Sequence, residues 1–381
     1  MPLTRVYLSP GMFGFAQLAG VDYFGHLARE IETRLDAAAR PAQVRVCEVH
    51  PTASIRRRAA KLVKMIESTC GEEGPIHIVG HSTGGLDGRL VASPTVHLDA
   101  ESDRLLGWID RLRSVTSINT PHYGTPLATF FATAKGQQLL YAVSAITVTA
   151  LKLGAPPLAV ASALVASLGR TRETMGFELA LVDKVTESTA KALDEAGSNR
   201  LRSWLRQVRD DQGGVVQLMP EAMDLFQAGV ENRAGVSYHC IASYAPPSTS
   251  VREWLGAVRR PWIAISATLF HFMYRITAAQ DERYPCNAPA DACATLRSMY
   301  RAAHLKSSEP PPISANEGVI PLYSQLWGKL LWVGKGDHLD VVGHFPGPGG
   351  HNDWLTSGSR FDLDRFHTIV DRIVQALLAA E

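Results

Sequence analysis

Hydrophobic and polar residues follow two alternating patterns along the first 120 positions of the chain. Short apolar runs rich in β-branched residues predict four strands, at 4–8, 44–49, 76–80 and 113–118. Between them, apolar residues recur at helical spacing over 23–39 and 54–69, which predicts helices there. Strands that alternate with helices at this spacing predict a parallel sheet with helices on both faces.

The alternation of predicted strands and helices ends after Pro126. Residues 127–235 have a helical pattern without a convincing strand, whereas 236–242 and 329–334 predict two further strands. The last segment, 360–380, carries a single apolar stripe, which predicts a closing helix.

These patterns predict one α/β core, built from residues 1–126 and 236–381. A helical cap at 127–235 interrupts it, and a second, cap-like insertion lies at about 246–315. Both insertions can cover one edge of the sheet.

An apolar stretch at 139–169 has the length of a bilayer-spanning helix. Lys152 and the sequence GAPP interrupt it, however, so two short helices joined by a turn fit better than one span.

Composition and charge limit the kinds of partner that the chain is expected to have. Hydrophobic residues make up 46% of the 381 positions and the net charge is +1, which gives no reason to expect a nucleic-acid partner. We interpret the basic run Arg56–Lys64 as a solvated helix face. The N-terminus lacks the pattern of a signal peptide, so the chain is expected in the cytoplasm unless a leader has been removed.

Five cysteines, an odd number, do not suggest a disulfide framework. Cys47 and Cys240 lie in predicted strands and are expected to be buried thiols. Cys286 and Cys293 could close a small loop in an oxidising compartment.

A serine stands between glycines where the strand at 76–80 ends. Residues 80–84 read Gly-His-Ser-Thr-Gly, which matches the pattern G-x-S-x-G. A helix-like segment follows, so Ser82 is expected on a sharp strand-to-helix turn with its side chain exposed. The flanking glycines lack Cβ atoms that would clash with the strand and the helix. We therefore predict that Ser82 is a nucleophile.

A serine nucleophile needs a histidine base held by a carboxylate. Because the acid and then the histidine follow such a serine in the chain, the position of His338 just past the last strand makes it the predicted base. Glu317, in a turn before that strand, is the predicted acid. The alternatives are His344 and His351 for the base, and Asp281 and Asp291 for the acid.

An oxyanion hole needs two backbone amides. The amide of Thr83, directly after the nucleophile, is the first candidate. The glycine-rich loop 8–15 follows the first strand, and Gly11 there would let the Met12 amide face the site.

Several segments together resemble the true-lipase family of Pseudomonas and Burkholderia, bacterial triacylglycerol lipases and esterases of the α/β-hydrolase fold. They are PGMFGFAQLAGVDYFGHL (10–27), GHSTGG (80–85), INTPHYGTPLA (118–128), NEG (316–318) and HLDVV (338–342). The resemblance implies a mostly parallel sheet with helices on both faces and a helical cap or lid. It implies the same assignments for the nucleophile, acid, base and oxyanion amides: Ser82, Glu317, His338, Met12 and Thr83.

The chain departs from the family at two of these positions. The family's oxyanion-loop histidine is Pro10 here, and its acid is a glutamate, Glu317, in place of an aspartate. The family's aspartate two residues after the histidine binds a structural calcium, and Asp340 matches it. One carboxylate is not a calcium site, so the alternative is that Asp340 caps its own loop. The chemistry itself is expected to need no cofactor.

The sequence thus predicts a serine hydrolase that cleaves hydrophobic carboxylic esters through an acyl-enzyme. Two alternatives stay open: an acyltransferase or polyester depolymerase using the same three residues, and a non-catalytic member of the fold that binds a lipid or a protein. The stretch 139–169 is either a lid that touches a lipid surface or a fixed part of the cap.

Overall fold

The computed structural model describes most of the chain. The described residues are 2–12, 17–18, 21–133, 195–247, 261–303, 309–349 and 355–381, together with the isolated positions 136–137, 140, 144, 187, 191, 351 and 353.

A six-stranded sheet forms the centre of the molecule, and every neighbouring pair of its strands is parallel. Across the sheet the order is β4 (Ala42–Val46), β1 (Thr4–Ser9), β5 (Ile76–His81), β6 (Leu112–Ile118), β7 (Ser237–Tyr244) and β8 (Lys329–Lys335). A small antiparallel pair, β2 (Gln17–Leu18) and β3 (Val21–Asp22), lies outside it. The predicted parallel sheet is confirmed. The predicted strand at 44–49 is displaced, because its pairing with β1 begins at Ala42 and ends at Val46.

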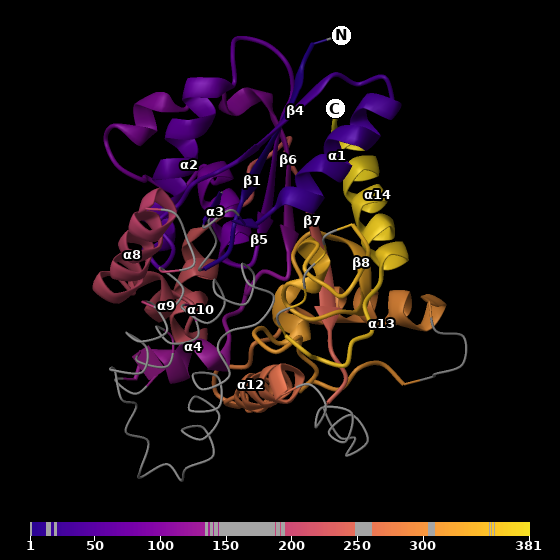
Figure 1. The fold of residues 1–381 in the computed structure, drawn as a ribbon. Coiled ribbons are helices and arrows are strands. Elements are labelled where there is room, and N and C mark those ends of the chain that lie inside the picture. Colours follow the sequence, from indigo (N-terminus) through magenta and orange to yellow (C-terminus); the bar gives the residue numbers. More distant parts are fainter. Residues whose placement is uncertain are drawn as a thin grey trace.

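Helices cover both faces of this sheet (Figure 1). On one face lie α1 (Gly25–Ala37) and α14 (Leu363–Ala380), and on the other α2 (Ile55–Thr69) and α3 (Thr83–Ala92). The apolar stripe of α14 is buried as its spacing predicted, with Ile369, Ile373 and Leu377 fully enclosed. Two apolar clusters, one on each face, therefore make up most of the core.

The described parts of both insertions are helical. The first contains α4 (Pro126–Phe131), α8 (Glu195–Asp210), α9 (Gly213–Gln217) and α10 (Pro220–Gly229), and the second contains α12 (Pro261–Ala278) and α13 (Ala290–Ala303). Four 3₁₀ turns complete the described elements: η1 (Ser102–Leu105), η2 (Ile109–Arg111), η3 (Leu322–Gln325) and η4 (Asp340–Val342). The stretch 139–169 lies outside the described residues except for positions 140 and 144.

Helices α4 and α12 lie at the end of the sheet opposite the two chain termini (Figure 1). They pack on each other, with the rings of Phe130 and Phe272 in edge-to-face contact at 5.7 Å. The hydroxyl of Thr277, on α12, donates a hydrogen bond to the Gly318 carbonyl at 3.2 Å. The second insertion is therefore anchored beside the turn that carries Glu317.

Within the described part of the chain, no helix combines the length and the apolar character needed to cross a membrane. All five cysteines are buried free thiols, which confirms the expectation for Cys47 and Cys240.

Candidate active site

Ser82 occupies a sharp turn between β5 and α3. Its backbone angles are φ 54° and ψ −127°, a conformation that residues with a side chain rarely adopt. Such a backbone costs about 1–3 kcal/mol and persists only where the surrounding structure imposes it. The Ser82 amide donates to the Ile118 carbonyl at 2.8 Å, which ties the turn to the neighbouring strand β6.

The glycines on either side of Ser82 are required by close packing. A Cβ atom at Gly80 would overlap the backbone of Gly84, and one at Gly84 would overlap the carbonyl oxygen of Ser9. The helix can thus start directly above the strand only if both positions lack side chains. The predicted strand-to-helix turn is confirmed. The predicted exposure of the Ser82 side chain is wrong, because Ser82 is only 5% exposed.

His338 and Glu317 meet although 21 residues separate them in the chain. His338 follows β8, Glu317 lies in the turn before η3, and Nδ1 of the histidine is 2.7 Å from Oε1 of the glutamate. The other carboxylate oxygen, Oε2, accepts from the Val319 amide at 2.7 Å. Burial lowers the pKa of His338 and raises the pKa of Glu317 well above its ordinary value. The pair predicted from chain order is therefore formed.

The alternative candidates for the base and the acid have other surroundings. Nε2 of His344 bonds the Tyr23 carbonyl at 2.9 Å, and His351 stacks on His26 with ring centroids 3.7 Å apart. Asp281 is exposed and pairs with Arg283, and Asp291 lies in the first turn of α13.

The base loop also touches the residue before the nucleophile. Nε2 of His81 lies 2.8 Å from the His338 carbonyl oxygen, and the two imidazole rings are 4.6 Å apart. Because His81 and Ser82 are consecutive, this contact places His338 beside the nucleophile turn.

Two backbone segments are positioned to supply oxyanion amides. Thr83 is the first residue of α3, where amides have no partner within the helix and the helix dipole favours negative charge. On the other side, a Cβ atom at Gly11 would lie 2.7 Å from the Cβ of Ser82. The loop that carries Met12 therefore runs directly against the nucleophile.

A buried arginine supports this loop, and the sequence did not reveal it. Arg58 is 1% exposed; it pairs with Asp87 at 2.8 Å and donates to the carbonyl oxygens of Pro10 and Gly11. Asp87 also accepts from the Ser9 hydroxyl at 2.8 Å. The interpretation of Arg56–Lys64 as a solvated face is wrong at Arg58, because this side chain turns inward to a carboxylate on α3.

Asp340 caps its own loop. Its Oδ2 accepts from the Asp337 amide at 2.8 Å and from the Ser359 hydroxyl at 2.7 Å. In return, Oδ1 of Asp337 accepts from the amides of Leu339 and Asp340, both at 3.0 Å. Among the described residues, no group of three or more His, Cys, Asp or Glu side chains could hold a metal ion. The contacts of Asp340 thus match the alternative of a loop-capping carboxylate.

One bacterial lipase is similar to part of the chain. No family model matches the chain. A triacylglycerol lipase of Vibrio cholerae serotype O1 is 37% identical over 125 residues, which is 32% of this chain and 34% of that protein. The match thus spans about one third of that relative's length.

Solved structures match over nearly the whole chain. Staphylococcus hyicus lipase has a TM-score of 0.50 and 15% identity, over 98% of this chain and 96% of that one. Lipase 1 from Pelosinus fermentans has a TM-score of 0.51 and 15% identity, over 98% and 99%. With the parallel sheet and the turn at Ser82, these likenesses show that the chain has the α/β-hydrolase fold.

Proposed function

We propose that this chain is a serine hydrolase that cleaves hydrophobic carboxylic esters. The observation that carries the proposal is the 2.7 Å hydrogen bond between His338 and Glu317, held beside a serine in a strained strand-to-helix turn. Structural requirements alone do not explain a buried carboxylate–imidazole pair next to a strained serine. Active sites are where such groups gather.

Each step of the proposed reaction is assigned to a residue of the chain. His338 takes the proton of the Ser82 hydroxyl as its oxygen attacks the ester carbonyl. The amides of Met12 and Thr83 stabilise the oxyanion, and His338 then gives the proton to the leaving alcohol. Water, activated by the same histidine, cleaves the acyl-enzyme and releases the acid. Glu317 orients the imidazole and stabilises its charged form.

The substrate class is inferred from the relatives and from the apolar insertions. Three of the proteins similar to this chain are named lipases, which supports a fatty acyl ester as the substrate. Contact of 139–169 with a lipid surface is part of the proposal, although that stretch lies outside the described residues.

A chain-length series of nitrophenyl esters tests this function. We expect turnover that rises from acetate toward longer acyl chains, because an apolar cleft gains binding free energy with each buried methylene, about 0.8 kcal/mol. Added short alcohols distinguish a hydrolase from an acyltransferase, because an acyltransferase would form alkyl esters in place of free acid. Absence of turnover with every ester would refute the proposal and leave a non-catalytic binding protein.

Calcium at Asp340 stays a prediction of the family resemblance, and a chelator tests it. Because Oδ2 of Asp340 already accepts two hydrogen bonds within the protein, we expect EDTA to leave the melting temperature unchanged. A fall in melting temperature that added calcium reverses would instead establish a structural ion. EGTA in an excess of magnesium is the matched control for a calcium-specific effect.

A further inference from the structure

We propose that Tyr23 and His81 are positioning residues. They hold the loop that carries His338 (the base loop) and the glycine-rich loop 8–15 in fixed positions on either side of Ser82. This inference rests on the proposed function, because it assigns these residues to the geometry of the same site. His81 ends β5 directly before the nucleophile, and Tyr23 lies in the turn between β3 and α1. Both side chains are buried, at 0% and 6% exposure.

The hydrogen-bond directions between these residues follow from chemistry. The His338 carbonyl can only accept, so Nε2 of His81 must carry the hydrogen in their 2.8 Å contact. Burial, followed by the neighbouring His338, lowers the pKa of His81 well below its ordinary value, which keeps the ring neutral. Nδ1 is therefore an acceptor, and the Tyr23 hydroxyl donates to it at 2.6 Å.

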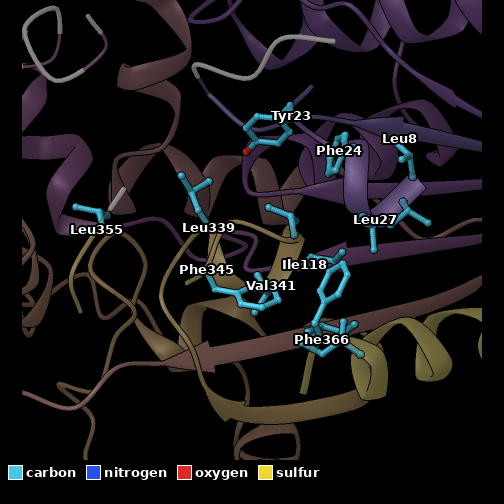
Figure 2. Close-up of a cluster of buried hydrophobic side chains, with 14 of the residues drawn as sticks. Leu8, Tyr23, Phe24, Leu27, Ile118, Leu339, Val341, Phe345, Leu355 and Phe366 are labelled. Carbon is cyan, nitrogen blue, oxygen red and sulfur yellow. The ribbon is translucent and has the colours of Figure 1, made fainter. Parts of the chain in front are cut away.

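Tyr23 also contacts the other two segments of the site. Its hydroxyl oxygen lies against Gly11, where an added Cβ atom would be 3.1 Å from it. Its carbonyl accepts from Nε2 of His344, six residues beyond the base. Figure 2 shows Tyr23 at the same end of the apolar cluster as Leu339, which follows His338 directly. One residue thus links the glycine-rich loop, the nucleophile turn and the base loop.

These contacts fix the positions of the reacting groups relative to one another. The Tyr23 hydroxyl, the His81 ring and the His338 carbonyl form a continuous hydrogen-bonded chain, and the hydroxyl end of this chain lies against Gly11. None of these groups needs to touch the acyl or alcohol part of a substrate. A misplacement of about 1 Å in a catalytic group can cost a factor of about 100 in rate. Loss of the chain should therefore lower kcat and leave KM nearly unchanged.

Three substitutions test the proposal. Tyr23→Phe removes only the hydroxyl, and we expect kcat to fall about 10-fold with KM within about twofold of wild type. His81→Leu removes both contacts of the ring and should lower kcat about 100-fold. His81→Gln should recover most of that loss, because its amide oxygen can accept from Tyr23 while its nitrogen donates to the His338 carbonyl.

Tyr7→Phe is the matched control. Tyr7 is fully buried on β1, and its hydroxyl bonds the Thr69 hydroxyl at 3.0 Å, away from the site. The same chemical change there should lower the melting temperature to a similar extent and leave kcat unchanged. Equal losses of kcat in both tyrosine variants would reduce the effect to general stability and overturn the proposal.

The outcomes separate this inference from the proposed function. If the wild type is active and the kcat of Tyr23→Phe lies within about twofold of it, the positioning role is overturned and the proposed hydrolase function still stands. That result decides the question even if His81→Leu fails to fold. A wild type that neither turns over esters nor reacts with a phosphonate probe at Ser82 would refute the hydrolase itself. The double variant Tyr23→Phe/His81→Leu should lose no more kcat than His81→Leu alone, because the two residues act in one chain.

Discussion

Ser82→Ala is expected to lower kcat for ester hydrolysis by about 10⁴-fold or more. The substitution removes the hydroxyl oxygen that acts as the nucleophile in the proposed reaction, and without it no acyl-enzyme can form. The proposed oxyanion amides are backbone groups that the substitution does not remove, so a small residual rate over water is expected. Initial rates with a nitrophenyl ester that the wild type cleaves well, measured on the purified variant, check this result.

The folded state should not change with this substitution. Alanine at position 82 must adopt the same positive φ of 54° as serine, so the strain in the turn is the same in both proteins. Ser93→Ala is a suitable control: Ser93 caps the other end of α3, where its hydroxyl lies 2.9 Å from that of Thr95. We expect it to keep kcat. Turnover that survives Ser82→Ala would assign the nucleophile to another serine.

The nucleophile turn could be predicted because its cause is largely local. Gly80 is needed because the backbone of Gly84 lies against it, within the same five residues, so the pentapeptide between a strand and a helix already specifies much of the turn. Gly84 is needed for a reason outside the pentapeptide, because the Ser9 carbonyl oxygen at the end of β1 lies against it. The closing helix was predictable for a similar reason, because the spacing of Ile369, Ile373 and Leu377 alone determines which face is buried.

The pairing of Glu317 with His338 was predicted from order along the chain and from the family resemblance. Each residue lies at the carboxyl end of the sheet, where the loops after parallel strands converge. Chain order narrows the candidates, but it does not say which histidine turns toward the serine. His344 lies in the same loop as His338 and turns instead to the Tyr23 carbonyl.

The groups that support the site could not be predicted. The contact between His81 and His338 joins positions 257 residues apart, and that between Tyr23 and His81 joins positions 58 apart. Neither has a spacing that a single sequence would reveal. Arg58 was misinterpreted because a run of basic residues looks the same whether all of them face water or one turns inward. Burial of that arginine is favourable because Asp87 on α3 and the carbonyl oxygens of Pro10 and Gly11 accept from it, and none of these contacts is visible in the sequence.

Glu317→Gln is expected to lower kcat by about 10³-fold. The glutamine would keep its oxygen on the Val319 amide, where Oε2 of the glutamate now accepts at 2.7 Å. Its NH₂ group would then face Nδ1 of His338, which could no longer carry a hydrogen. The ring would be held in the tautomer with the hydrogen on Nε2, and that nitrogen could not take the Ser82 proton. Steady-state kinetics with the same ester as for Ser82→Ala measures the loss.

Stability and activity should separate in this variant. Burial raises the pKa of Glu317, so the ionised carboxylate is costly to hold in the fold and a neutral amide of the same shape is not. The melting temperature should therefore stay the same or rise while kcat falls, which excludes misfolding as the cause. Asp291→Asn, the matched change on α13, should leave kcat unchanged. If Asp291→Asn abolished turnover and Glu317→Gln did not, the acid would be misassigned, and the 2.7 Å contact with His338 would be only a structural hydrogen bond.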